Sequence, residues 1–142
     1  MILYIKRLTG TAKSPVYGTK DSAGMDLHAD ETITIQPGET ALIHTGLSFQ
    51  IPVGFVGLVF PRSGMSLRTS LRQPNSVGVI DADYRGEVRG MFQNTGDAPI
   101  TIQHGDRFAQ MVIVPFVHPT IEDAAELSAT ERGIGGFGST GV

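Results

Sequence analysis

The glycine-rich C-terminal end is the segment of this sequence best suited to binding an anion. It begins at Arg132, and five of its 11 residues are glycine. Closely spaced glycines let backbone N–H groups approach an anion, Arg132 offers a planar fork of donors, and Ser139 and Thr140 add hydroxyls. A flexible terminus is the alternative, but the embedded Arg132 and Phe137 favour a phosphate clamp. The segment is not a P-loop, because no Gly-Lys-Ser/Thr follows.

A second candidate anion site is the tetrapeptide Pro-Arg-Ser-Gly at residues 61–64. It lies between an apolar, strand-like run and a segment with helical character. The start of a helix carries free N–H groups and a partial positive charge, so Arg62 and Ser63 there suit a phosphate oxygen. In the alternative, Ser63 only caps the helix, which is a common use of serine. The two interpretations are compatible.

Two aspartates are candidates for catalysis and metal binding. Asp81 directly follows the apolar run 77–80, where we expect a partly buried carboxylate that can orient a water molecule as a general base. Asp83, two residues further along the same hairpin-like segment, is by default a turn former. Asp26 lies among apolar neighbours and, close to a polyphosphate, is a reasonable partner for Mg²⁺ through water.

Alternating hydrophobicity predicts that strands position these residues. Residues 43–51 alternate between apolar and polar, and residues 108–116 offer two apolar faces, as in a strand buried on both sides. Gly-, Pro-, Asn- and Asp-rich turns separate the candidate strands. This spacing predicts an all-β sandwich, jelly roll or barrel. Further short strands are expected at residues 2–8, 32–35, 55–60, 77–80, 87–93 and 99–102.

Helical signals are few. Residues 66–72 are expected to form a helix of about two turns that ends before Pro74, because the residue before a proline is pushed out of the α region. Residues 121–127 have no sustained apolar stripe and are expected to be loop. We expect one domain over residues 1–131, followed by an arm, 132–142, that becomes ordered only against a ligand or neighbour.

Composition excludes several classes of protein. The 142 residues are enough for one domain, and the absence of cysteine excludes thiolate zinc sites, Fe–S clusters and a cysteine nucleophile. The net charge of −3 disfavours a nucleic-acid polymer as partner. The apolar runs are far too short to span a membrane, and the N-terminal residues lack a signal-peptide pattern, so we expect a soluble cytoplasmic protein. The histidines show no metal-ligand spacing, and no GxSxG motif occurs.

Five segments, in order, resemble the five motifs of the trimeric dUTP pyrophosphatases (dUTPases). From about residue 20 to the C-terminus, the resemblance covers nearly the whole chain. Any one motif is weak, whereas five in order are specific. The segments are AGMDLHA at Ala23, PRSG at Pro61, NSVGVIDADYRGEV at Asn75, GDRFAQMVI at Gly105 and RGIGGFGSTG at Arg132.

This resemblance implies a fold, an assembly and a reaction. The fold is a jelly-roll-like β subunit, and the assembly is a homotrimer whose three active sites are shared between subunits, the tail of one closing over the site of another. The reaction is Mg²⁺-dependent hydrolysis of dUTP to dUMP and pyrophosphate. It limits uracil incorporation into DNA and supplies dUMP for dTTP synthesis.

The resemblance also implies residue roles. Asp81 would activate the water that attacks the α-phosphorus, and Asp26 would contact Mg²⁺ through water. Tyr84 would lie against the deoxyribose and exclude a 2′-hydroxyl, and Phe137 would cover the uracil ring. The hairpin residues that would read the uracil edge are Asn75 and the backbone around Gly78. The residues that would hold the phosphates are Arg62, Ser63, Gly64 and Gln110 from the body, and Arg132, Gly138, Ser139 and Thr140 from the tail.

Three alternatives remain open at the level of sequence. A dCTP deaminase, or its bifunctional relative, would share the fold but resembles this chain less after the third motif. A non-catalytic protein that senses dUTP or binds a protein partner would keep the same trimer. A purely structural β protein has no need of Arg, Ser and Asp at these positions.

Overall fold

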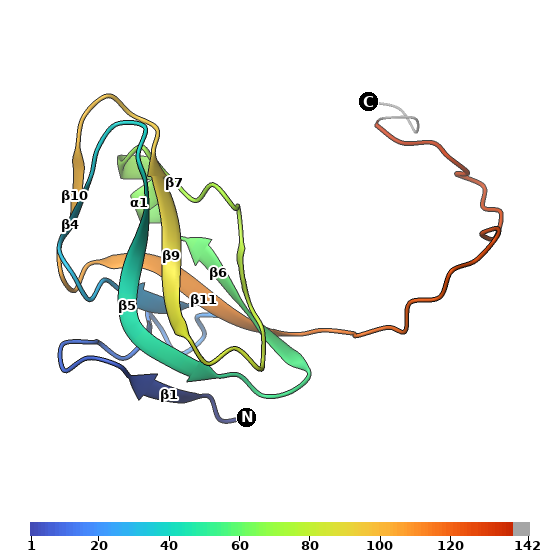
Figure 1. The fold of residues 1–142 in the computed structure, drawn as a ribbon, viewed down its shortest axis with the longest axis horizontal. Coiled ribbons are helices and arrows are strands. Elements are labelled where there is room, and N and C mark those ends of the chain that lie inside the picture. The colour runs from blue at the N-terminus through green and yellow to red at the C-terminus, as the bar shows by residue number, and fades with distance from the viewer. Residues whose placement is uncertain (138–142) are drawn as a thin grey trace.

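The computed structural model describes residues 1–137, which form short antiparallel strands and one short helix (Figure 1). The predicted all-β, jelly-roll-like fold is confirmed. The elements are β1 (Tyr4–Arg7), β2 (Val16–Tyr17), β3 (Met25–His28), β4 (Ile33–Ile35), β5 (Thr40–Gln50), β6 (Phe55–Pro61), α1 (Ser63–Arg68), β7 (Leu71–Arg72), β8 (Gly78–Ile80), β9 (Glu87–Asn94), β10 (Ile100–Ile102) and β11 (Arg107–Pro115).

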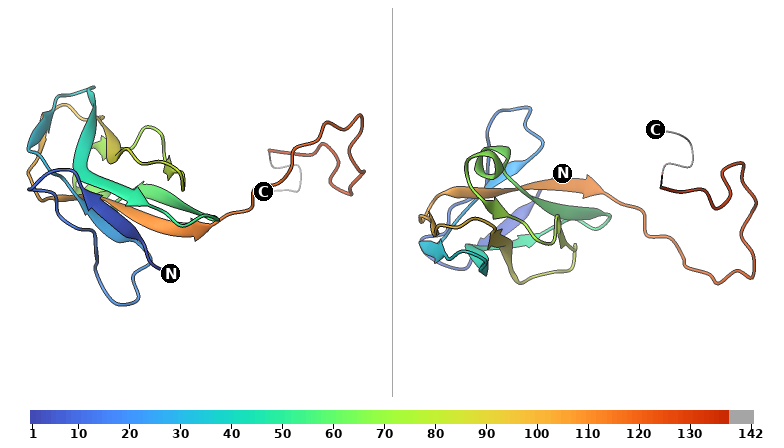
Figure 2. Two further views of the ribbon diagram at one scale, coloured as in Figure 1. Left: turned by 60° about the horizontal axis from the view of Figure 1, so that its bottom comes forward. Right: turned by 90° about the horizontal axis from the view of Figure 1, so that it is seen from above.

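The strands form two main sheets and one small ribbon. One sheet has the order β1-β5-β9-β7, the other β2-β3-β11-β6-β8, and β10 pairs with β4. All pairings are antiparallel. The two main sheets face each other around a shared core, which is seen best when the molecule is turned (Figure 2).

Alternation along the strands builds this core, as the sequence predicts. On β9, Val88, Gly90 and Phe92 are buried, while Arg89 and Met91 between them face outward. The rings of Phe92 and Phe108 meet edge to face, with centroids 5.8 Å apart, and so join the two sheets. A side chain at Gly90 would collide with the Phe108 ring, so glycine allows this close packing.

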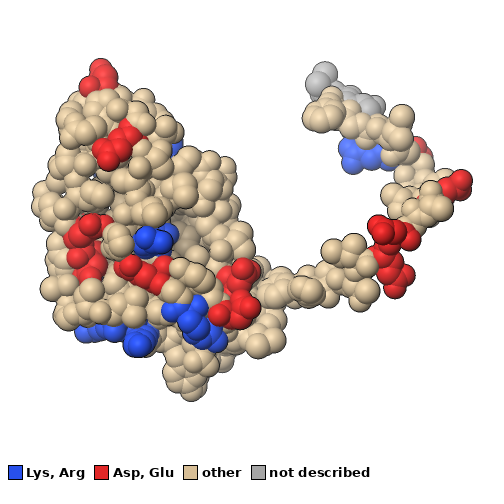
Figure 3. Space-filling view, viewed as in Figure 1, with Lys and Arg blue, Asp and Glu red and all other residues tan. Residues whose placement is uncertain are grey.

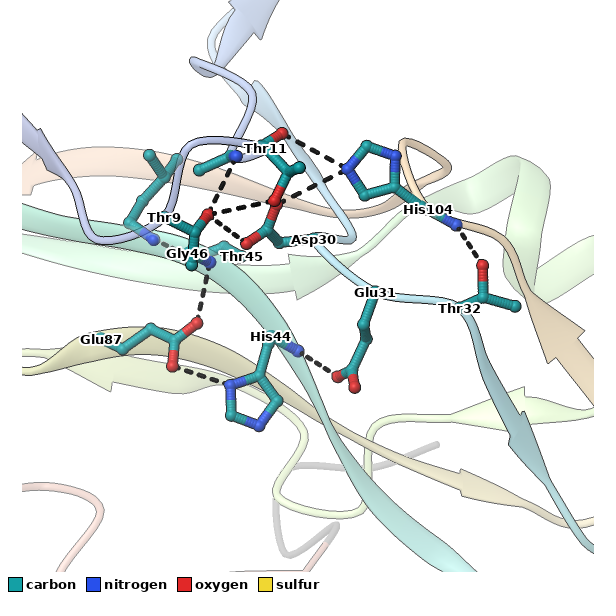
Figure 4. Close-up of polar contacts among 12 residues, drawn as sticks. Thr9, Thr11, Asp30, Glu31, Thr32, His44, Thr45, Gly46, Glu87 and His104 are labelled. Carbon is teal, nitrogen blue, oxygen red and sulfur yellow. Dashed lines mark hydrogen bonds and ion pairs between the residues drawn. The ribbon is translucent and has the colours of Figure 1, made fainter.

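A bulge in β5 is held by partly buried polar groups (Figure 4). The β5–β9 register shifts between His44 and Ser48, where Gly46 has a φ of 64°. The carboxylate of Glu87 accepts hydrogen bonds from the Gly46 N–H at 2.8 Å and from His44 Nδ1 at 2.7 Å. Glu87 thereby ties the start of β9 to the bend in β5.

Asp30 forms a second polar contact beside this bulge. It accepts a hydrogen bond from the Thr9 hydroxyl at 2.5 Å, and a side chain at Gly46 would collide with it. Burial alone would raise the pKa of the Asp30 carboxyl, but hydrogen bonds from Thr9 and Thr11 and the charge of His104 outweigh burial and lower it. The carboxylate therefore stays ionised in the fold.

The helix differs from the predicted range 66–72. It covers Ser63–Arg68, so it begins three residues earlier and ends four residues earlier. Thr69 ends it, because this residue is extended and its hydroxyl donates to the Met65 carbonyl at 2.8 Å. Residues 71–72 pair with β9 instead, and Leu71 is fully buried there. Tertiary pairing therefore overrides the local helical preference.

Residues 116–137 contain no helix or strand and extend away from the body of the protein (Figure 1). The loop predicted at 121–127 lies in this segment. Its apolar side chains are exposed, as shown by Val117, Ile121 and Leu127, each at least 87% accessible. Within the described part of the chain, no helix is long and apolar enough to cross a membrane.

Asn94, at the end of β9, is a fully buried polar residue with all its hydrogen bonds made. Its Nδ2 donates to the carbonyls of Ile35 at 3.0 Å and Ala98 at 2.8 Å. Its Oδ1 accepts from the Ser70 hydroxyl at 2.9 Å and the Gly96 N–H at 3.0 Å. Asn94 thus connects β9 to three neighbouring segments.

We expect Asn94→Asp to lower the free energy of unfolding by about 3 kcal/mol, because a buried carboxylate would face two carbonyls with no donor between them. Urea unfolding at fixed protein concentration measures the change. The control is Gln36→Glu, which places the same chemical change on an exposed side chain. Equal midpoints for the two variants would contradict this role for Asn94.

Candidate functional site

A polar cavity of about 410 Å³ opens at the C-terminal end of β6. It gathers five residues that the sequence singles out: Asp26, Arg62, Ser63, Gly64 and Gln110. Their convergence follows from strand register, because β11 lies between β3 and β6 and pairs Gln110 with both Asp26 and Phe60. Segments far apart in the sequence therefore meet at one point. The loop between β2 and β3 completes the wall with Gly18, Ser22, Ala23 and Gly24.

Asp26 holds two arginines at the floor of this cavity. Its Oδ1 accepts from Arg62 Nε at 2.7 Å, and its Oδ2 accepts from Arg107 Nη1 at 3.1 Å. The Asp26 side chain is only 10% exposed, so these charge-assisted bonds are shielded from water. Two cations against one anion leave a surplus positive charge facing the cavity, which suits an anionic ligand such as phosphate.

Arg107 is a cavity residue that the sequence did not single out. The sequence feature that could have identified Arg107 is its position in the GDRFAQMVI segment, three residues before Gln110. A β-bulge between Arg107 and Ala109 breaks the alternation of β11 at this point. Which way the Arg107 side chain points therefore depends on the bulge rather than on a regular strand pattern.

Gln110 supports the backbone that carries Arg62. Its Nε2 donates to the Pro61 carbonyl at 3.1 Å. A Cβ atom at Gly24 would lie 2.7 Å from Gln110 Oε1, so glycine at this position leaves room for the amide. Gln110 thus fixes the end of β6 while its amide remains at the cavity wall.

The start of α1 contributes backbone donors. Arg62 is the N-cap residue and makes no side-chain capping bond, so Ser63 is the first helical residue and not the cap. The alternative in which Ser63 only caps the helix is therefore wrong. Ser63 is exposed at the cavity. The first N–H group of the helix that donates to the Arg62 carbonyl is that of Met65, so the N–H groups of Ser63 and Gly64 have no partner within the helix.

Burial and the positive charges around the cavity lower the pKa of His28. Its pKa lies below its usual value, mainly because of burial and next because of the Lys13 charge. Asp26 raises the pKa of His28, whereas Arg107 and Arg62 lower it further. The imidazole is therefore held in its neutral form beside a cationic site.

A metal held by protein groups alone does not fit these residues. In residues 1–137, no group of three or more His, Cys, Asp or Glu side chains is arranged to hold an ion. Asp26 is the carboxylate of the cavity, and both its oxygens already accept from arginine. The donor set fits an ion that keeps most of its waters and is carried by phosphate oxygens, as Mg²⁺ commonly is.

Asp81 lies away from this cavity, near the other end of β6. In the β6–β8 pairing, Ile80 lies opposite Gly57, and Asp81 continues past it. Gly57 and Arg62 are five residues apart, which is about 17 Å along a strand. Asp81 instead lines two other hollows, of about 560 and 260 Å³, which share no lining residue with the first.

Asp81 is exposed in this chain, so the expectation that it would be partly buried is wrong for the single subunit. The reason is that β8 is the edge strand of its sheet, so no further strand of the sheet covers the residues that follow it. Tyr84 in the same hairpin is 42% exposed, and its hydroxyl donates to the Glu87 carbonyl at 3.1 Å.

The remaining predicted residues are dispersed. Asn75 is exposed before β8, and Gly78 lies within β8, where its missing side chain allows close packing on Val59. Arg132 and Phe137 are exposed on the extended segment. The residues that lie outside the described part of the chain are Gly138, Ser139 and Thr140.

The fold and this cavity define an all-β protein with a preformed polar cavity in which two arginines face one aspartate. The family model described as dUTPase matches residues 11–141, and the chain belongs to the dUTPase family. The chain is 49% identical over 132 residues to the "Deoxyuridine 5'-triphosphate nucleotidohydrolase" of Rhizobium leguminosarum bv. trifolii (90% of this chain, 85% of that protein). To the protein of that name from Nautilia profundicola it is 46% identical, over 99% of both chains.

Solved structures show the same family. The dUTPase of Staphylococcus bacteriophage 80alpha with dUPNHPP is 33% identical to this chain, with a TM-score of 0.94 over 99% of both chains. A mutant dUTPase from phage phi11 of S. aureus, described as revealing the coordination of a structural Mg(II) ion, is 30% identical, with a TM-score of 0.86 over 91% of this chain and 100% of that one.

We expect Arg62→Lys to weaken the binding of inorganic pyrophosphate about tenfold, because lysine cannot bind Asp26 and still present a fork of donors to the ligand. Isothermal titration calorimetry measures the affinity. Arg72→Lys is the matched control, since the Arg72 guanidinium binds the Thr69 and Leu71 carbonyls outside the cavity. Equal affinity in both variants would exclude Arg62 from the anion site.

Proposed function

We propose that this protein is a dUTP diphosphatase that hydrolyses dUTP to dUMP and pyrophosphate, thereby limiting uracil incorporation into DNA and supplying dUMP for dTTP synthesis. Its membership of the dUTPase family and the names of relatives that are 46% and 49% identical support the assignment. The observation that carries the proposal is the cationic cavity formed by Asp26, Arg62 and Arg107 at the start of α1. This cavity has the charge and donors that a triphosphate requires.

In the proposed reaction, Arg62, Ser63, Gly64 and Gln110 hold the phosphates, with Arg107 adding positive charge. Asp81 accepts a proton from a water molecule whose oxygen attacks the α-phosphorus. A new phosphorus–oxygen bond forms, and the bond from the α-phosphorus to the oxygen bridging to the β-phosphate breaks, which releases pyrophosphate. Such catalysis consists mostly of positioning and charge stabilisation, which matches the static donors of this site.

The separation of Asp81 from Arg62 supports a homotrimer with shared sites. Arg62 follows the C-terminal end of β6, whereas Asp81 follows Ile80, which lies opposite Gly57 near the other end of that strand. This separation favours a site to which two chains contribute. In the trimer, the anion cavity of one subunit meets the Asp81 hairpin of another.

The extended segment supports a role for the tail as an arm of this assembly. In our proposal, residues 1–131 include the domain and the connection, and residues 132–142 form the arm that closes over a neighbour's site. Arg132 and Phe137 are exposed, ready to meet a ligand outside their own subunit. There Phe137 covers the uracil, while Arg132, Gly138, Ser139 and Thr140 bind the terminal phosphates.

The Asp81 hairpin supplies the proposed base and sugar selectivity. Asn75 and the backbone around Gly78 read the uracil edge, where a fixed pattern of backbone donors and acceptors rejects cytosine. Tyr84 lies against the deoxyribose and leaves no room for a 2′-hydroxyl. The exposed ring of Tyr84 is compatible with this contact.

Mg²⁺ is the proposed cofactor, carried by the triphosphate and contacted by Asp26 through water. When bound, it would neutralise phosphate charge during transfer. The protein's own contribution is to orient Arg62 and Arg107 through Asp26. A cytoplasmic location, and the absence of a nucleic-acid polymer or a membrane among the partners, remain predictions from the sequence.

We expect Asp81→Asn to lower the turnover of dUTP about 10²- to 10⁴-fold while dUTP still binds, because the amide cannot accept the proton from water. Pyrophosphate release measures turnover, and calorimetry measures binding. Asp83→Asn is the matched control on the same exposed hairpin. Unchanged turnover in Asp81→Asn would remove Asp81 from the mechanism. In the wild type, ammonia release from dCTP would indicate a deaminase. Binding of dUTP without turnover by the wild type would indicate a sensor.

We expect two inactive variants, Arg62→Ala and Asp81→Asn, to regain activity when they are co-assembled. In a shared site, one chain supplies Arg62 and another Asp81, so random mixing at equal amounts restores about a quarter of the sites. The control pairs Arg62→Ala with the double variant Arg62→Ala/Asp81→Asn, where no site is complete. Failure to regain activity would mean that one chain contributes both residues.

A further inference from the structure

We propose that Gly86 and the backbone carbonyl of Glu87 are positioning groups for the Tyr84 ring, so that discrimination between dUTP and UTP depends on groups that do not touch the nucleotide. The inference rests on the proposed function, in which Tyr84 contacts the sugar. It goes beyond that function by assigning the cause of the ring's position.

The Tyr84 ring lies directly over Gly86. A Cβ atom built on Gly86 would overlap the Tyr84 hydroxyl and would lie 2.6 Å from Cζ and 3.0 Å from Cε2. Real Cβ contacts are essentially never below 3.0 Å, so the ring would have to move. Gly86 is not among the glycines with positive φ, so its backbone would accept alanine without strain. An alanine here therefore acts on the ring, not on the backbone.

The far end of the ring is held by Glu87. The Tyr84 hydroxyl donates to the Glu87 carbonyl at 3.1 Å, and the Tyr84 N–H donates to the Asp81 carbonyl at 3.2 Å. The ring is thus restrained at its backbone, along the Gly86 side and at its hydroxyl. At 42% accessibility, it still offers surface to a ligand.

Glu87 is itself immobilised. Its carboxylate binds the Gly46 N–H and His44 Nδ1 at the bulge of β5 (Figure 4). The neighbouring Arg85 carbonyl accepts from the Ser48 hydroxyl at 2.7 Å. These contacts tie both sides of Gly86 to the long strand β5, so the position of the Tyr84 hydroxyl follows from the sheet.

Exclusion of a 2′-hydroxyl is a steric effect and is sensitive to small displacements. A site that rejects one extra oxygen by lack of space loses selectivity once the blocking ring shifts by a few tenths of an ångström. In the proposed shared site, the cavity that holds the phosphates belongs to another subunit, so a shift of this ring leaves those contacts in place. The specificity ratio should therefore change more than the turnover of dUTP.

The experiment compares kcat/KM for dUTP and UTP in wild type, Gly86→Ala and Gly10→Ala. Gly10 is the matched control, because nothing lies within 4 Å of a Cβ atom there. We expect the dUTP-to-UTP ratio to fall about tenfold in Gly86→Ala, which is the low end of what one methyl group changes in a substrate pocket. We expect no change in Gly10→Ala.

A double-mutant cycle separates positioning from a structural effect. On a Tyr84→Ala background, Gly86→Ala should no longer change the ratio, because the two residues act as one unit. If the ratio still falls on that background, or is unchanged in Gly86→Ala alone, the inference is wrong. Failure of wild type to hydrolyse dUTP would instead overturn the proposed function.

Tyr84→Phe keeps the proposal testable if Gly86→Ala does not fold, as judged by circular dichroism and the unfolding midpoint. This variant removes the hydrogen bond to Glu87 and keeps the ring. We expect the dUTP-to-UTP ratio to fall in the same direction, because the ring loses its hydrogen bond to the Glu87 carbonyl. An unchanged ratio would overturn the role of the Glu87 carbonyl.

Discussion

The antiparallel pairing of β6 with β11 on one side and β8 on the other is the constraint on which the site depends. It brings Arg62 beside Asp26 and Gln110 at one end of the strand, and it places Asp81 near the other end. Because a strand rises about 3.3 Å per residue, these two ends cannot meet within one subunit. The proposed reaction, which needs both residues at one nucleotide, therefore goes together with the proposed assembly of several subunits.

Charge is distributed unevenly over the chain. The whole chain has 11 basic and 14 acidic residues, which gives a net charge of 11 − 14 = −3. Residues 117–131 contain four of the acidic residues and no Lys or Arg, so the rest of the chain has a net charge of 11 − 10 = +1. Acidic side chains line the extended segment (Figure 3). Such charge keeps an exposed connection solvated and extended. At the cavity, Arg62 and Arg107 outnumber Asp26, so the local charge is positive although the charge of the whole chain is negative.

Patterns of alternation predicted most of the fold, because burial on one face of a strand leaves a direct mark on the sequence. The strand predicted at residues 43–51 lies almost entirely in β5 and buries Ile43, Leu47 and Phe49, although Gly46 and Ser48 between them are buried as well. Short pairings left no such mark. The strands β2, β3 and β7 were not predicted, and residues 71–72 were expected in a helix. Arg107 and the exposure of Asp81 were missed for a related reason, since both depend on a bulge or a sheet edge that appears only on pairing.

By itself, the sequence determined the residue types available for chemistry and their order: a glycine-rich end, an arginine before a short helix, and an aspartate after an apolar strand. These are local properties of the chain. Only the tertiary structure decided which of them are neighbours, because register between distant strands sets side-chain contacts. It joined Asp26 to Arg62 and Arg107, laid the Tyr84 ring over Gly86, and separated Asp81 from the anion cavity.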